Sequence, residues 1–156
     1  MAFAYPRKVR WSCQRCTLCC GDTPKRERQI LLLETEAELI KTKTGHTVDE
    51  IATPVSKFHS YKYQLRKRSS DGKCIFLRGN HCMIYEFRPL ICRFYPFWLE
   101  KLGSGKYVFK VSTECPGIGR GQLLSRKFFL ELFREAIEAL AVSYTHLRAH
   151  ETVLDL

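Results

Sequence analysis

Residues 13–21 read Cys13-Gln14-Arg15-Cys16-Thr17-Leu18-Cys19-Cys20-Gly21 and hold half of the chain's eight cysteines. A Cys-x-x-Cys spacing lets two sulfurs reach one ion, at about 2.3 Å each for zinc. Two such spacings are fused here, and they are followed by a fourth cysteine and by a glycine that can adopt a positive φ. Cysteines buried only for packing have no reason to recur at this spacing. The stretch, called the cysteine turn below, therefore predicts a metal-binding turn that organises the fold.

Three kinds of centre use such a turn. Zinc takes four ligands, so the turn needs at most one more from elsewhere, or it divides its cysteines between two ions. A ferredoxin-type iron–sulfur cluster uses the same spacing with a remote Cys-Pro as the fourth ligand, and the chain contains Cys115-Pro116. Disulfides are the least favoured alternative, because no secretory signal is present and eight cysteines in 156 residues is below the density of a disulfide scaffold.

The chain has 156 residues, of which 45% are hydrophobic and 27% charged, enough for one compact domain with a core. The first residues contain no signal-peptide pattern, and no run of about 18 apolar residues occurs. We therefore predict a single cytoplasmic, metal-binding domain over residues 1–141, with no membrane association and with reduced thiols. Residues 142–156 resemble a translated sequencing-adapter read-through, and we predict that they are a non-native tail.

The formal net charge is +10, with basic clusters at Lys25–Arg28 and Arg66–Arg68. Such a charge favours encounters with nucleic acid, anionic lipid or acidic partners. Acidic and apolar residues interrupt both clusters, and no nucleic-acid recognition signature accompanies them. A solvated basic face is the preferred interpretation, and nucleic acid is a possible but unsupported partner.

Short elements are expected after the cysteine turn. The apolar run Gln29–Leu33 predicts a strand. Thr35 with Glu38, and Thr47 with Glu50, match capping boxes, so two short helices are expected there.

Further patterns place the later cysteines. The alternation from Tyr61 to Leu65 and the run Cys74–Leu77 predict a hairpin, and the turn at Gly79-Asn80 returns the chain to Cys82. Cys74 and Cys82 then lie on either side of a tight reversal, where their sulfurs can approach one ion.

Sequence patterns in the C-terminal half predict one short helix, one hairpin and one long helix. Pro89 suits a first helical turn, so a short helix presenting Cys92 is expected to end before Pro96. A hairpin across Gly103–Gly105 leads to Cys115, and apolar residues recur at helical spacing over 123–141. The predicted fold class is α+β: a small, irregular, metal-organised domain with short hairpins, short helices and a C-terminal capping helix.

With these motifs the chain resembles the YkgJ-like cysteine-cluster family of zinc- or iron-chelating proteins. The matching stretches are the cysteine turn, Cys74 with Phe76-Leu77, Cys82-Met83-Ile84-Tyr85-Glu86-x-Arg88-Pro89-x-x-Cys92-Arg93-x-Tyr95-Pro96-Phe97, and Cys115-Pro116-Gly117. The resemblance implies metal binding by all eight cysteines: Cys13, Cys16, Cys19, Cys20, Cys74, Cys82, Cys92 and Cys115. Flagellin lysine-N-methylases share a similar cluster, but no glycine-rich methyl-donor site is seen in this sequence.

The number and pairing of centres stay open at this point. Eight thiols divide into two four-ligand centres, or one centre takes four and the others pack. Adjacent residues of an extended chain point apart, so Cys19 and Cys20 are expected to serve different centres, or one of them is a bystander. Arg88 and Arg93 either pair with a carboxylate such as Glu86 or offset thiolate charge.

The sequence thus predicts a metal-binding cysteine-cluster protein that holds zinc or an iron–sulfur cluster. Two alternatives remain: an iron–sulfur-dependent redox or methyl-transfer enzyme, and a basic zinc module that binds nucleic acid. No Ser-His-Asp arrangement or carboxylate pair near the cysteines assigns a catalytic residue, so the chain's status as an enzyme is left undecided.

Overall fold

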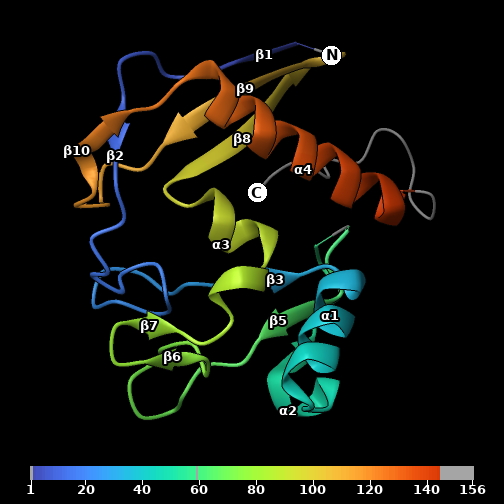
Figure 1. Ribbon diagram of the computed structural model, residues 1–156. Coiled ribbons are helices and arrows are strands. Elements are labelled where there is room, and N and C mark those ends of the chain that lie inside the picture. Colours follow the sequence, from blue (N-terminus) through green and yellow to red (C-terminus); the bar gives the residue numbers. More distant parts are fainter. Residues whose placement is uncertain (1, 59, 145–156) are drawn as a thin grey trace. The chain divides into compact units, whose positions relative to one another are not determined.

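The computed structural model describes residues 2–58 and 60–144 and has the predicted α+β class (Figure 1). Its chain divides into two compact units, the first made of Met1–Gln14 with Phe94–Leu156 and the second of Arg15–Arg93. Most of the predicted non-native tail, residues 145–156, lies outside the described residues. Among the described helices, none combines the length and the apolar character needed to cross a bilayer.

The first unit is built on a three-stranded sheet. β8 (Phe97–Gly103) and β9 (Lys106–Val111) form the hairpin that the sequence predicts. β1 (Ala2–Ala4) adds to β9 in the parallel direction, which the sequence did not indicate. A second pair joins β2 (Arg10–Trp11) to β10 (Ile118–Leu123), so the N-terminal arm is tied to the chain that follows Cys115.

The long C-terminal helix packs on this sheet through aromatic rings. α4 (Arg126–Tyr144) covers the sheet (Figure 1), and Phe129 is fully buried between the rings of Phe97 and Phe109, with centroids 5.1 Å from each. Phe133 stacks on Phe3 at 4.9 Å. Such ring pairs add to the energy of apolar burial. The predicted apolar stripe of this helix is confirmed by the buried residues Phe129, Leu132, Phe133, Ala136 and Leu140.

The second unit has its own small sheet. Its strands are β3 (Leu31–Leu32), β4 (Ala52–Pro54) and β5 (Tyr63–Leu65), with β5 in the middle and both pairings antiparallel. The predicted chain reversal between β5 and the Cys74 segment is present, with an antiparallel bridge from Lys67 to Cys74. The predicted pairing of β5 itself is wrong, because its partners are β3 and β4.

Two helices lie against this sheet. α1 (Glu34–Thr44) and α2 (Val48–Ile51) bury Ile40 and Ile51 in an apolar cluster that also contains Leu32. The capping box of Thr47 with Glu50 is confirmed. The box predicted between Thr35 and Glu38 is wrong, because Glu36 reaches back to the backbone of Leu33 instead. The helix therefore begins two residues earlier than predicted.

The remaining cysteines of the second unit sit on short elements. β6 (Leu77–Arg78) and β7 (His81–Cys82) pair around the predicted Gly79-Asn80 turn. A 3-10 turn, η1 (Tyr85–Phe87), leads to α3 (Leu90–Phe94), which begins after Pro89 and carries Cys92 as predicted. Cys82 and Cys92 are thus held by elements of only two and five residues.

Gly21 closes the cysteine turn at a point of very close backbone approach. Its φ is +138°, and a Cβ there would lie 2.5 Å from the Gly72 carbonyl oxygen and 2.6 Å from the Lys73 Cα. A bridge joins Gly21 to Lys73. The positive φ that the sequence predicts for this glycine is confirmed, and no side chain fits in the space.

We expect Gly21→Ala to lower the free energy of unfolding by about 3 kcal/mol or more, because the new methyl group must displace backbone. Gly79→Ala is the matched control, since Gly79 also has a positive φ (+61°) but nothing lies within 4 Å of its added Cβ. Its loss is expected to be about 1–2 kcal/mol, the cost of the left-handed backbone alone. Urea unfolding followed by circular dichroism measures both, and equal losses would contradict the close-approach argument.

Candidate metal centre

All eight cysteines are described, and all eight are free thiols. Six of them lie in the second unit, whereas Cys13 and Cys115 lie in the first. Cys13 and Cys16 are exposed, Cys74 and Cys115 are buried, and the other four are partly buried. The predicted ligand set is therefore divided between the two units.

The cysteine turn contains two left-handed residues that are not glycine. Arg15 has φ +54° and Thr17 has φ +66°. A β-branched residue such as Thr17 is uncommon in this region, and such positions cost about 1–3 kcal/mol each. The Thr17 carbonyl accepts the Cys20 amide at 3.0 Å, which closes a tight turn. This turn, rather than an extended segment, sets the directions of the Cys19 and Cys20 side chains.

Cys19 and Cys20 point toward one another. Their side chains share a hydrogen bond, which lowers the pKa of Cys19 and raises that of Cys20. The expectation that adjacent cysteines point apart is therefore wrong here, because it assumed an extended chain. The two neighbouring sulfurs therefore lie within hydrogen-bonding reach of one another.

Three later thiols join this pair. Cys82 and Cys92 interact electrostatically with both Cys19 and Cys20, and with each other. Cys74 interacts with Cys82 and Cys92, and its amide donates to the Cys20 carbonyl at 2.7 Å. We call these five residues the thiol cluster: Cys19, Cys20, Cys74, Cys82 and Cys92. Residues 54 to 73 positions apart in the sequence are thus brought together.

Burial and mutual repulsion oppose ionisation in most of the thiol cluster. Burial is the main cause that raises the pKa of Cys74 to about 11 and that of Cys92 to about 12. Burial also raises the pKa of Cys82. Since metal ligands must be thiolates, a bound cation would displace protons from these groups and would relieve the repulsion between them.

Backbone amides already point at two of the sulfurs. The Phe76 amide donates to Cys74 Sγ at 3.5 Å, and the Ile84 amide donates to the sulfur of Cys82. In both cases the donor lies two residues after the cysteine. Hydrogen bonds to the charged form favour it and lower the pKa of each thiol against the effect of burial. A thiolate at Cys74 or Cys82 would therefore be stabilised by a backbone amide that is already in place.

Two cationic side chains donate hydrogen bonds to carbonyl groups of the cysteine turn. The Arg28 guanidinium donates to the Cys19 carbonyl at 2.9 Å, and Lys73 Nζ donates to the Thr17 carbonyl at 3.3 Å. The charge of Arg28 also lowers the pKa of both Cys19 and Cys92. These two residues were missed in the sequence, because a basic residue carries no spacing signal that marks it as a partner of a distant turn.

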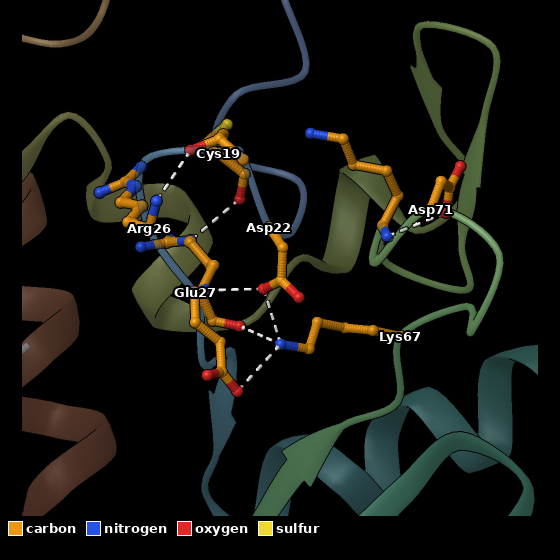
Figure 2. A network of polar contacts seen from close by, with 9 residues as sticks. Cys19, Asp22, Arg26, Glu27, Lys67 and Asp71 are labelled. Carbon is orange, nitrogen blue, oxygen red and sulfur yellow. Dashed lines mark hydrogen bonds and ion pairs between the residues drawn. The ribbon is translucent and has the colours of Figure 1, made fainter.

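A charged brace supports the same region (Figure 2). Lys67 Nζ donates to Asp22 Oδ1 at 2.7 Å and to the Arg28 carbonyl at 3.0 Å. Asp22 Oδ1 also accepts the Arg28 amide at 2.8 Å. Figure 2 shows the Lys67 ammonium between the carboxylates of Asp22 and Glu27. The brace ties the segment after the cysteine turn to the chain that leads to Cys74.

Arg88 and Arg93 differ in the groups on which their charges act. Arg88 lowers the pKa of Cys19 and Cys82 by its positive charge, so it offsets thiolate charge. Arg93 instead acts on a carboxylate, but that carboxylate is Glu36 rather than Glu86.

The thiols do not yet converge on a point. Among residues 2–58 and 60–144, no group of three or more His, Cys, Asp or Glu side chains is arranged to hold a metal ion as it stands. His81 Nδ1 lies 3.4 Å from the Arg15 guanidinium. The donor chemistry nevertheless fits a soft or borderline ion, because five sulfurs interact within one unit.

Comparison with known proteins agrees with this chemistry. The sequence matches, over residues 12–116, the family CxxCxxCC, described as "Putative zinc- or iron-chelating domain". The matched region covers most of the chain and all eight cysteines, so the chain belongs to this cysteine-cluster, zinc- or iron-chelating family.

Among curated proteins, the chain is similar to "Uncharacterized protein MJ0939" of Methanocaldococcus jannaschii, with 28% identity over 93 residues. The match covers 50% of this chain and 33% of that protein, so the chain spans about a third of the relative's length. No solved structure matches.

Proposed function

We propose that the chain binds a metal centre through the thiolates of the thiol cluster, with zinc or an iron–sulfur cluster as the occupant. The observation that carries the proposal is the mutual electrostatic interaction of five thiols drawn from four separate segments. Thiolates that repel one another are stabilised as a group by a cation bound among them. Four thiolates are the number of ligands that a structural zinc ion or a cubane iron–sulfur cluster requires, and the thiol cluster supplies five.

Charge balance supports the same proposal. Four thiolates around Zn²⁺ leave a net charge of −2, which cations and amides near the sulfurs stabilise. Arg28 and Arg88 act on Cys19, and the Phe76 and Ile84 amides donate to Cys74 and Cys82. Such outer partners are part of most metal sites in proteins and tune how tightly the metal is held.

The physiological setting is part of the proposal. Free thiols persist where the surroundings are reducing, so we propose that the protein acts in the cytoplasm. No contact or recognition motif among the described residues favours an iron–sulfur enzyme or a nucleic-acid-binding zinc module over this function.

Anaerobic purification followed by metal analysis tests the proposal. Zinc in a colourless protein, or iron with acid-labile sulfide in a brown protein, would support it and would identify the occupant. A protein that takes up neither zinc nor iron under reducing conditions, although its thiols titrate as free, would overturn it.

The number of bound ions per chain is a second result of the same measurement. One ion or cluster per chain agrees with a centre built from the thiol cluster alone. Two zinc ions agree with the prediction that all eight cysteines ligate, which includes Cys13, Cys16 and Cys115.

A further inference from the structure

Glu36 makes a contact that its position in a helix does not explain. Its Oε1 accepts the Leu33 amide at 3.0 Å, which is the ordinary reach-back of a third helical residue to the N-cap. Its other oxygen, Oε2, accepts the amide of Leu90. One partly buried carboxylate therefore joins the start of α1 to the start of α3, 54 residues further along the chain.

The Leu90 amide lies at the first residue of α3. Pro89 has no N–H, so Leu90 supplies the first free donor of this helix. The helix has five residues, and its first turn closes when the Cys92 amide donates to the Pro89 carbonyl at 2.9 Å. A helix this short has few hydrogen bonds of its own to fix its start. Holding the Leu90 amide therefore fixes the turn that presents Cys92.

The charge of Glu36 has a partner on the same helix. Burial raises the pKa of Glu36, whereas the Leu33 and Leu90 amides and the Arg93 charge lower it. Arg93 follows Cys92 directly, so Glu36 interacts with α3 on both sides of this cysteine. The charges that lower the pKa of the thiols come from other residues, Arg28 and Arg88.

Glu50 is a glutamate at the equivalent position of another helix, and it lacks the second contact. It occupies the equivalent capping position of α2, and its Oε1 accepts the Thr47 amide at 2.8 Å. Its side chain is 58% exposed, and its Oε2 lies 3.6 Å from His46. Glu50 caps only its own helix, whereas Glu36 also accepts a hydrogen bond from α3, the helix that carries Cys92.

We propose that Glu36 is a positioning residue of the metal centre, which holds Cys92 in place through the Leu90 amide at the start of α3. The inference rests on the proposed function for its effect on metal binding. The anchoring of Cys92 itself is measurable without metal. Glu36 does not touch the sulfur, so its action is through the helix.

The test compares Glu36→Gln with Glu50→Gln in the full chain. A glutamine amide offers one acceptor oxygen, so E36Q can accept the Leu33 amide or the Leu90 amide but not both, and it carries no charge toward Arg93. E50Q loses the same charge at a helix cap and leaves α3 untouched. Two readouts are taken under anaerobic conditions: Co²⁺ affinity from its thiolate charge-transfer absorption, and the iodoacetamide reactivity of each cysteine in the metal-free protein by peptide mass spectrometry.

For E36Q we expect Co²⁺ affinity to fall about 10- to 100-fold, the range found for outer partners of metal ligands, and E50Q to change it less than about 2-fold. We also expect Cys92 to be alkylated several-fold faster in metal-free E36Q while Cys74 keeps its rate.

Two results would overturn the inference: an unchanged Cys92 rate in E36Q, or a parallel rise at Cys74 that signals general loosening of the unit. A wild-type chain that binds no Co²⁺ would instead contradict the proposed function, and the Cys92 rate would still decide whether Glu36 anchors α3.

Discussion

Cys82→Ser is expected to reduce zinc affinity more than about 100-fold under reducing conditions. Cys82 interacts with Cys19, Cys20, Cys74 and Cys92, and its sulfur already accepts the Ile84 amide. A serine hydroxyl is not ionised near neutral pH and is a harder, weaker ligand for zinc than a thiolate. Since outer partners alone account for about 10- to 100-fold, the loss of a direct ligand is expected to exceed that range. Anaerobic competition against a chromophoric chelator measures the change.

The matched control for this substitution is Met83→Leu. Met83 follows Cys82 directly and is 59% exposed, so the exchange keeps the size and apolar character of the side chain without touching a thiol. We expect its zinc affinity to equal that of the wild type. An equal fall in both variants would show that the β7 region, and not the Cys82 sulfur, is what zinc requires.

The same serine exchange at Cys13, Cys16 and Cys115 tests the wider ligand set. Cys13 and Cys16 are exposed, and Cys115 is buried in the first unit. A loss of zinc affinity or stoichiometry comparable with that of Cys82→Ser would add the residue to the ligands. Retention of full binding would restrict the centre to the thiol cluster.

Removing the metal is expected to loosen the cysteine-bearing part of the second unit. Structural zinc contributes roughly 10–16 kcal/mol of binding free energy, which is comparable with the whole stability of a small domain. The segments concerned are joined by the two-residue pair β6–β7 and by isolated bridges from Gly21 to Lys73 and from Lys67 to Cys74. Such short ladders supply few backbone hydrogen bonds. Amide hydrogen exchange, with and without a strong chelator, is the measurement.

In the metal-free protein we expect the largest gains of exchange in residues 16–28 and 74–92. The hairpin β8–β9 is the internal reference, because its paired strands have six or more residues each and pack on the aromatic core of α4. Its amides are expected to keep their protection. Unchanged exchange over residues 16–28 after verified metal loss would contradict a structural role for the metal.

The sequence predicted the elements whose signals are local. The Thr47–Glu50 box, the Gly79-Asn80 turn, the start of α3 after Pro89 and the stripe of α4 each depend on residues within one or two turns of chain. The β1–β9 pair was missed because Ala2–Ala4 is too short to show a period, and its parallel partner lies about a hundred residues away. The β5 hairpin was assigned to the wrong partner because alternation marks a strand but not the strand that it pairs with.

The site was predicted in its residue types but not in its arrangement. Spacing and family resemblance identified the cysteines. The side chains of Cys19 and Cys20 were misjudged because the turn at Thr17 depends on a left-handed residue that is not glycine, which no sequence pattern indicates. Arg28, Lys73 and Glu36 were missed since their roles arise from contacts 9 to 56 residues away in the chain.

The brevity of β6, β7 and α3 has a kinetic consequence. A segment secured by a handful of backbone bonds can detach and reattach many times during the life of one folded molecule. A ligand sulfur on such a segment can therefore swing away and be replaced by a competing thiol while the rest of the chain stays native. A metal ion bound through such segments is therefore expected to exchange quickly with competing thiols even where its affinity at equilibrium is high.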